Sequence, residues 1–116
     1  MKKEIKIAVL AAIAAANPEG FTVDAKTLQP VTSGYAVAVK ATQNSFNAKG
    51  LALVVDYAAT DSEVTAFGGW LDSETGLYYY DAVVITDSFE RAKAIAEREG
   101  QIAFFSLKEM KEYRIK

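Results

Sequence analysis

Apolar residues recur at three- and four-residue intervals in three segments of the chain, which is the spacing of one face of a helix. These segments are residues 1–16, 51–59 and 88–100. Residues 17–20 are expected to end the first helix, because proline cannot continue it. Asp87 and Glu90 have the spacing of a capping box, so Asp87 is the predicted cap of the last helix.

A two-residue alternation predicts strands at residues 21–24, 35–40, 64–72, 77–86 and 102–105, with a further short edge strand at 113–115. The segment 77–86 is apolar on both faces, which indicates a central strand covered on both sides. One of these faces carries Leu77, Tyr79, Asp81, Val83 and Ile85. The helix between this strand and the next is typical of a right-handed crossover between parallel strands.

Together these patterns predict the fold class and the domain organisation. We expect one α+β domain over residues 1–116, with a mixed, mostly antiparallel sheet of about five strands and three helices. The length fits one domain, and about half of the residues are apolar, which is enough for a core of its own.

Residues 1–16 resemble a secretory signal, because Lys2 and Lys3 precede an apolar run. Glu4 and Lys6 interrupt the entry to that run, and most of the run is alanine, which favours helices but is weakly hydrophobic. We therefore expect an Ala-rich helix of the domain and a cytoplasmic protein, with export as the alternative. The run is too short to span a bilayer, so we expect no membrane association.

The chain contains neither cysteine nor histidine. This excludes a Ser-His-Asp triad, a thiolate nucleophile and the usual zinc sites within the chain. The chemistry left open uses carboxylates, a Lys or Tyr base, or oxygen ligands for Mg²⁺ or Ca²⁺. The acidic residues lack the spacing of a calcium loop, and we expect no metal and no cofactor.

Charge is spread unevenly along the chain. No basic residue occurs between Lys49 and Arg91, whereas both ends of the chain are basic. The acidic middle is explained by solvated turns and helix caps, or by a face that attracts a basic partner.

The segment from Gly68 to Asp81 predicts a β-hairpin whose turn, residues 72–76, has turn-forming residues throughout. Asp72 is expected to bond the amides that follow it, and Gly76 to adopt a positive φ. The hairpin gathers aromatic residues beside two glycines, and it is a candidate binding surface formed by Gly68, Gly69, Trp70, Tyr78 and Tyr80. The alternative is a set of cross-strand core pairs, with the glycines in a bulge beneath a ring.

Two further features are candidates for the same surface. The uncharged polar loop of Thr42, Gln43 and Asn44 is expected to orient a ligand, with Lys40 nearby; the alternative is a loop in which Ser45 or Asn47 caps the next helix. Asp81 places a charge in the middle of an apolar strand, so it must be paired, exposed or functional. Lys40 is the partner we expect.

Several segments resemble a family of short, uncharacterised proteins of Bacteroidetes phages and integrated mobile elements. They are NPEGFTV (17–23), SGYAVA (33–38), TQNSF (42–46), GGW (68–70), TGLYY (75–79) and QIAFF (101–105). Members of that family have Asp where this chain has Ser106, which argues against a role for this position. The resemblance implies a cytoplasmic setting and no activity.

Three functions remain open at this point. The first is a non-enzymatic accessory module that binds an unidentified protein partner through the hairpin and the polar loop. The second is single-stranded nucleic-acid binding on aromatic residues, with the basic termini holding phosphates. The third is a small carboxylate-based enzyme that uses Asp81 with Lys40 or a tyrosine. A homodimer is compatible with each of them.

Overall fold

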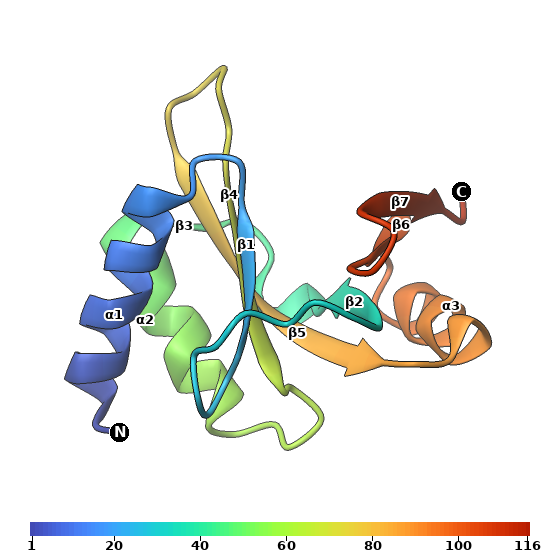
Figure 1. Ribbon diagram of the computed structural model, residues 1–116, viewed down its shortest axis with the longest axis horizontal. Helices are drawn as coiled ribbons and strands as arrows, with labels where there is room; N and C mark the ends of the chain where they lie inside the picture. Colours follow the sequence, from blue (N-terminus) through green and yellow to red (C-terminus); the bar gives the residue numbers. More distant parts are fainter.

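One twisted antiparallel sheet runs through the molecule, and the computed structural model describes it for all residues, 1–116 (Figure 1). The elements, in chain order, are α1 (Lys3–Ala16), β1 (Phe21–Asp24), β2 (Tyr35–Ala38), the 3-10 turn η1 (Lys40–Thr42), β3 (Ser45–Phe46), α2 (Asn47–Ala58), β4 (Ala66–Leu71), β5 (Tyr78–Thr86), α3 (Phe89–Arg98), β6 (Ala103–Ser106) and β7 (Lys111–Arg114).

The strand order is β1-β4-β5-β2-β6-β7, and β3 pairs with β5 outside this path. Every neighbouring pair is antiparallel. Since β5 and β6 both run antiparallel to β2, which lies between them, they are parallel to each other. The β5–α3–β6 segment is therefore the expected crossover, and it passes over one intervening strand.

The α+β class and the three helices agree with the sequence, but the sheet has seven strands where about five were expected. The shortest strands show little alternation of apolar and polar residues. β3 has only two residues, which is too short for an alternation to show. β7 is Lys-Glu-Tyr-Arg, and it begins two residues and ends one residue before the tail strand that the sequence predicts.

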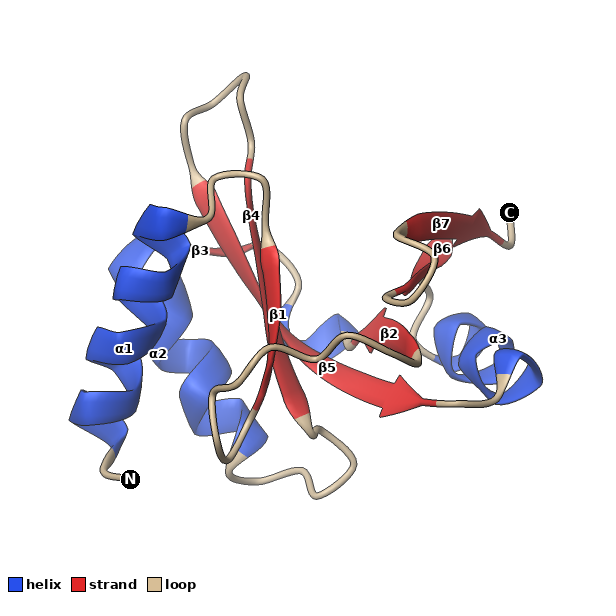
Figure 2. Ribbon diagram, viewed as in Figure 1, coloured by secondary structure: helices blue, strands red, loops and turns tan.

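The helices divide the sheet into two parts (Figure 2). α1 and α2 lie side by side against β1, β4 and β5, where Leu10, Leu51, Val54 and Phe67 are fully buried. α3 packs against β2 and β6, where the rings of Tyr35, Phe89, Phe104 and Tyr113 meet at centroid distances of 5.1–6.4 Å. β5 belongs to both parts.

Two helix caps differ from the sequence-based expectation. α2 has Phe46 at its N-cap and no side-chain cap, so neither Ser45 nor Asn47 caps it. The reason is that Ser45 pairs with Tyr80 in β3, and Gly50 packs directly against the Ser45 backbone. α3 is capped by Ser88, whose Oγ accepts a hydrogen bond from the Arg91 N–H, rather than by Asp87.

The Ala-rich segment forms the α1 helix of the domain, with Leu10 and Ala14 buried against the rest of the molecule. None of the helices has both the length and the apolar character needed to cross a bilayer.

Candidate functional site

The β4–β5 hairpin has the turn that its residues dictate. Asp72 Oδ1 accepts from the Glu74 N–H at 3.0 Å, and its Oδ2 accepts from the Thr75 hydroxyl at 3.1 Å. Gly76 has a φ of +74° and donates its N–H to the Asp72 carbonyl at 2.8 Å. The Asp72 carboxylate is thus occupied by the turn itself.

Tyr78 and Tyr80 lie on the face of the hairpin that the helices cover. Tyr80 is buried in the core, and the Tyr78 hydroxyl donates to the Asn17 carbonyl at 2.6 Å. Burial raises the pKa of Tyr78 to about 12. These two tyrosines therefore hold the helices and sheet together and are not presented to a partner.

Gly69 lies on the same face and leaves room for the aromatic rings there. A Cβ at Gly69 would come within 2.8 Å of Tyr78 Cε1 and closer still to the Phe21 ring, so these rings occupy the space of the missing side chain. The strand contains no bulge here, because the register runs without interruption from Ala66↔Val83 to Leu71↔Tyr78. The expected rings over the glycine are present, and the expected bulge is not.

The other face of the hairpin carries an exposed row of three aromatic residues, which we call the aromatic ladder. Tyr79 on the central strand pairs with Trp70 on β4 and with Phe46 on β3. The Trp70 and Tyr79 rings stack at 4.9 Å and 17°, and Phe46 meets Tyr79 edge-on at 5.7 Å. Trp70 is 48% exposed and Phe46 is 42% exposed. Such aromatic surface, fixed by cross-strand pairing, is typical of binding interfaces.

Asp81 lies on the same face, one pleat away from Tyr79. Its cross-strand partner on β4 is Gly68, which has no side chain that could pair with the carboxylate. The structure contains no ion pair to Asp81, and burial alone raises the pKa of its carboxyl to about 6. A half-buried carboxylate without a cation is a group that a ligand with a donor can satisfy.

The polar loop borders this face, and its residues differ in their roles. Thr42 is fully buried, and its Oγ1 accepts from the Ala82 N–H at 3.0 Å, which is a structural role. Gln43 and Asn44 are exposed, and Asn44 adopts a φ of +64° immediately before β3. The loop thereby runs alongside the part of β5 that carries Asp81.

Lys40 does not pair with Asp81, contrary to expectation. Its side chain is exposed and forms no ion pair. Its backbone N–H donates to Glu99 Oε1 at 3.0 Å, which fixes η1 to the C-terminal end of α3.

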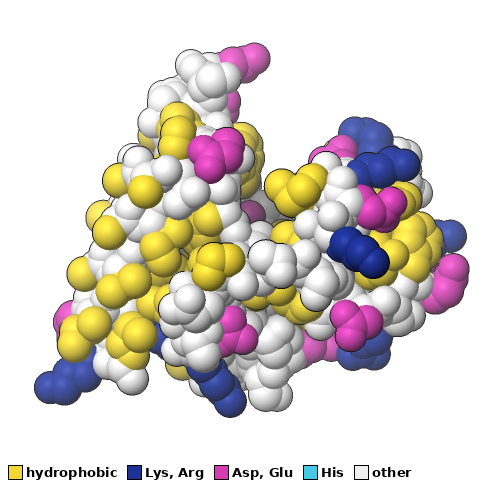
Figure 3. Space-filling model, viewed as in Figure 1, with side chains coloured by type: hydrophobic (Ala, Val, Ile, Leu, Met, Phe, Trp, Pro, Cys, Tyr) yellow, Lys and Arg dark blue, Asp and Glu magenta, His cyan; other side chains and the backbone are white.

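Side chains alternate along β5, so the ladder and Asp81 lie on the face opposite to Tyr78 and Tyr80. α1 and α2 cover only the side of Tyr78 and Tyr80 (Figure 1). The space-filling view shows a recess on the side of the ladder, between the projecting hairpin and the β6–β7 arm (Figure 3). Gly34, at the end of the connection from β1 to β2, lies close to Ile85 and Thr86, where β2 begins to pair with β5. We call the part left uncovered the open face; it comprises Phe46, Trp70, Tyr79 and Asp81.

Sequence reasoning missed Tyr79 and Phe46. The alternation had already grouped Tyr79 with Asp81, so a signal for Tyr79 existed in the register of the hairpin. Phe46 had none, because a two-residue strand leaves no periodic trace.

No three His, Cys, Asp or Glu side chains lie close enough together to hold a metal ion. The open face offers aromatic surface and one carboxylate, which suits binding. Searches among protein-family models, curated proteins and solved structures found no match to this chain. The resemblance to proteins of phages and mobile elements therefore stays a prediction.

Proposed function

We propose that this protein is a non-enzymatic binding module that holds a protein partner on its open face. The observation that carries the proposal is the juxtaposition of the aromatic ladder with the unpaired carboxylate of Asp81. Interface centres are enriched in Trp and Tyr, and a buried charge gains most from a partner of opposite sign.

The chemistry of the open face defines the partner. Stacked rings receive an apolar or aromatic side chain, and Asp81 receives the Lys or Arg of an extended segment. Gly68 on β4, which pairs with Asp81, has no side chain that would compete for the carboxylate. The exposed amides of Gln43 and Asn44 are available at the border for backbone hydrogen bonds.

The other two functions have less support. The phosphates of a nucleic acid on this face would be repelled by Asp81, and the nearby hairpin turn adds the negative charges of Asp72 and Glu74. The N-terminus lies far from the hairpin tip (Figure 1), so its lysines do not surround the ladder. An enzyme with Asp81 and Lys40 would need these groups to converge, and they form no ion pair.

The resemblance to proteins of phages and mobile elements extends the proposal: the module is an accessory protein of such an element and acts in the cytoplasm.

A dimer formed through the open face would occupy the same residues as a partner. The oligomeric state of the purified protein must therefore be measured by sedimentation alongside every binding measurement.

The test is a selection from a random peptide display library against the purified protein. Selected peptides are expected to combine an aromatic residue with Lys or Arg. Trp70 is the only tryptophan, so its emission reports occupancy of the open face directly. Trp70→Ala is expected to weaken binding by roughly tenfold or more, as measured calorimetrically, and Asp81→Asn to remove the preference for a cation.

Leu53→Ala is the matched control, because Leu53 on α2 is 50% exposed, almost the same as Trp70, and lies outside the open face. Peptides whose affinity is indifferent to Trp70 and Asp81 contradict the proposal. Binding of a single-stranded oligonucleotide that falls steeply with salt would instead favour the nucleic-acid function.

A further inference from the structure

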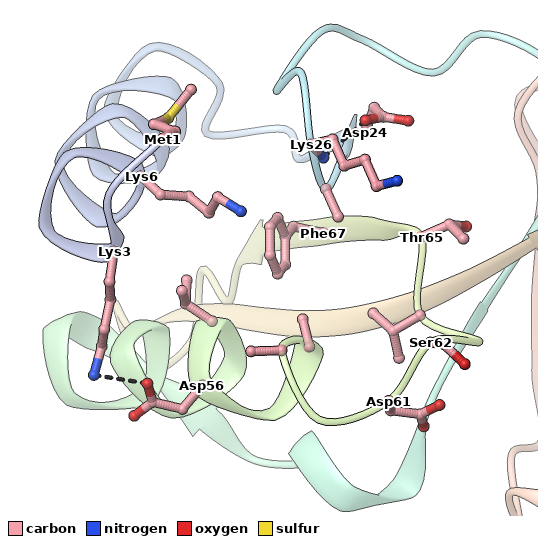
Figure 4. A pocket seen from close by; sticks show the side chains of 15 residues that line it. Met1, Lys3, Lys6, Asp24, Lys26, Asp56, Asp61, Ser62, Thr65 and Phe67 are labelled. Carbon is pink, nitrogen blue, oxygen red and sulfur yellow. Dashed lines mark hydrogen bonds and ion pairs between the residues drawn. The ribbon is translucent and has the colours of Figure 1, made fainter.

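A second candidate site lies on the helix-covered side of the molecule and uses no residue of the open face. It is a cavity of about 600 Å³ between the N-terminal end of α1, the C-terminal end of α2 and the turn after β1 (Figure 4). Small-molecule sites commonly have volumes of roughly 300–1,000 Å³. We call it the α1–α2 pocket.

The inner wall of the α1–α2 pocket is apolar. It is formed by Val55 and Ala58 on α2, Val64 in the following loop, and Phe67 on β4. These residues belong to the core or pack against it, so the wall is held by the fold. The wall favours a ligand with an apolar body over a bare inorganic ion.

The carboxylates that border the pocket are already satisfied within the protein. Asp24 accepts two backbone N–H bonds from the turn that follows it, which lowers the pKa of its carboxyl. Asp56 pairs with Lys3 at 2.7 Å. Asp61 accepts from the Tyr57 hydroxyl at 2.8 Å. None of the three needs an added cation.

Two lysines of the same pocket have no such partner. Neither Lys6 nor Lys26 forms an ion pair, and Lys6 Nζ lies 5.9 Å from the centroid of the Phe67 ring. Figure 4 shows the Lys6 side chain reaching from α1 across the opening toward Phe67, with Lys26 on the far side of the ring. The pocket therefore combines an apolar wall with two ammonium groups that form no ion pair.

We propose that the α1–α2 pocket binds a small organic anion, an apolar chain or ring that ends in a carboxylate or sulfonate. The anionic group lies toward Lys6 and Lys26, and the apolar body lies against the wall formed by α2 and Phe67. The orientation follows from the helix dipole, because the C-terminal end of α2 borders the pocket and disfavours negative charge there.

The test compares two fluorescent probes that share an aromatic body. The anionic probe is 8-anilinonaphthalene-1-sulfonate, and the neutral probe is N-phenyl-1-naphthylamine, which lacks the sulfonate. The variant Lys6→Met/Lys26→Met is expected to bind the anionic probe roughly tenfold more weakly than the wild type, with little change for the neutral probe. Ala59→Trp, placed to fill the pocket, is expected to weaken both.

Lys49→Met/Lys93→Met is the matched control, because it removes the same charge from exposed positions outside the pocket. Circular dichroism must show that each variant is folded, since partly unfolded chains also bind such probes. The proposal is overturned when the wild type binds no anionic probe at millimolar concentration, or when the Lys6/Lys26 variant binds it as well as the control. Neither result affects the open face, which is tested with other residues.

Discussion

Asp81 is the residue whose environment is least compatible with its charge. Its carboxyl is half-buried beside a glycine, and burial raises its pKa from 3.8 to about 6. A carboxyl with a raised pKa binds its proton more tightly in the folded chain than in the unfolded chain. The folded state therefore loses stability as pH rises from about 4 to about 6, and the loss is complete above that window.

We expect Asp81→Asn to remove this loss. At pH 7.5 the variant should be more stable than the wild type by about 1–3 kcal/mol, since a shift of two pKa units corresponds to about 3 kcal/mol before screening by solvent. At pH 4 the difference should disappear. Urea unfolding at both pH values measures it, and a variant that is less stable at pH 7.5 would show that the carboxylate has a stabilising partner.

The adjacent glycines of β4 provide a second contrast at the residue scale. Gly69→Ala is expected to cost about 1–3 kcal/mol, because the new methyl meets the Phe21 and Tyr78 rings. Gly68→Ala is the matched control: its Cβ would lie 3.3 Å from Val83 Cγ2, on the other face, and should cost far less. Equal losses in thermal unfolding would contradict the assignment of the two faces.

At the scale of elements, η1 and the residue before it attach the first half of the chain to β5. The Val39 N–H donates to the Ala82 carbonyl at 3.0 Å, and the Ala82 N–H donates to Thr42 Oγ1. The Thr42 side chain thus takes the place of a neighbouring strand at Ala82. This residue lies between the part of β5 that pairs with β3 and the part that pairs with β2.

Thr42→Val should therefore destabilise the protein by about 1–3 kcal/mol, because it leaves the buried Ala82 N–H without an acceptor. Thr42→Ser keeps the hydroxyl and should recover most of that loss. Chemical denaturation of the three proteins checks this order, and an equal loss in the two variants would mean that the methyl group, and not the hydrogen bond, matters.

At the scale of the whole molecule, the two parts of the sheet differ in how they are held. β5 is covered by α2, and both β4 and β5 are paired on both edges, whereas β7 pairs only with β6 and is mostly exposed. Amide hydrogens of β7 are expected to exchange faster than those of β5. Native-state exchange followed by NMR tests the order, and equal protection would indicate that the sheet opens as one unit.

Much of this architecture was predictable, and its limits have physical reasons. The hairpin, its Asp72–Gly76 turn and the crossover follow from local spacing and turn chemistry. Alternation separates the two faces of β5, but it does not say which face the helices cover, and so Tyr78 and Tyr80 stood as candidates in place of Tyr79. The contribution of Phe46 depends on a contact between distant segments, which no local pattern records.

The central place of β5 also determines the order in which the chain can fold. The β4–β5 hairpin closes over a short turn, whereas β1 and β2 pair with strands that are made more than forty residues later. Such distant pairings slow folding, because the conformational entropy of a long loop is lost before any stabilising contact forms. During synthesis β1 must therefore remain unpaired until Gly69 of β4 has been added, and β2 until Thr86 of β5 has been added. The risk of aggregation is greatest in this interval, because strands with free edges pair readily with other chains.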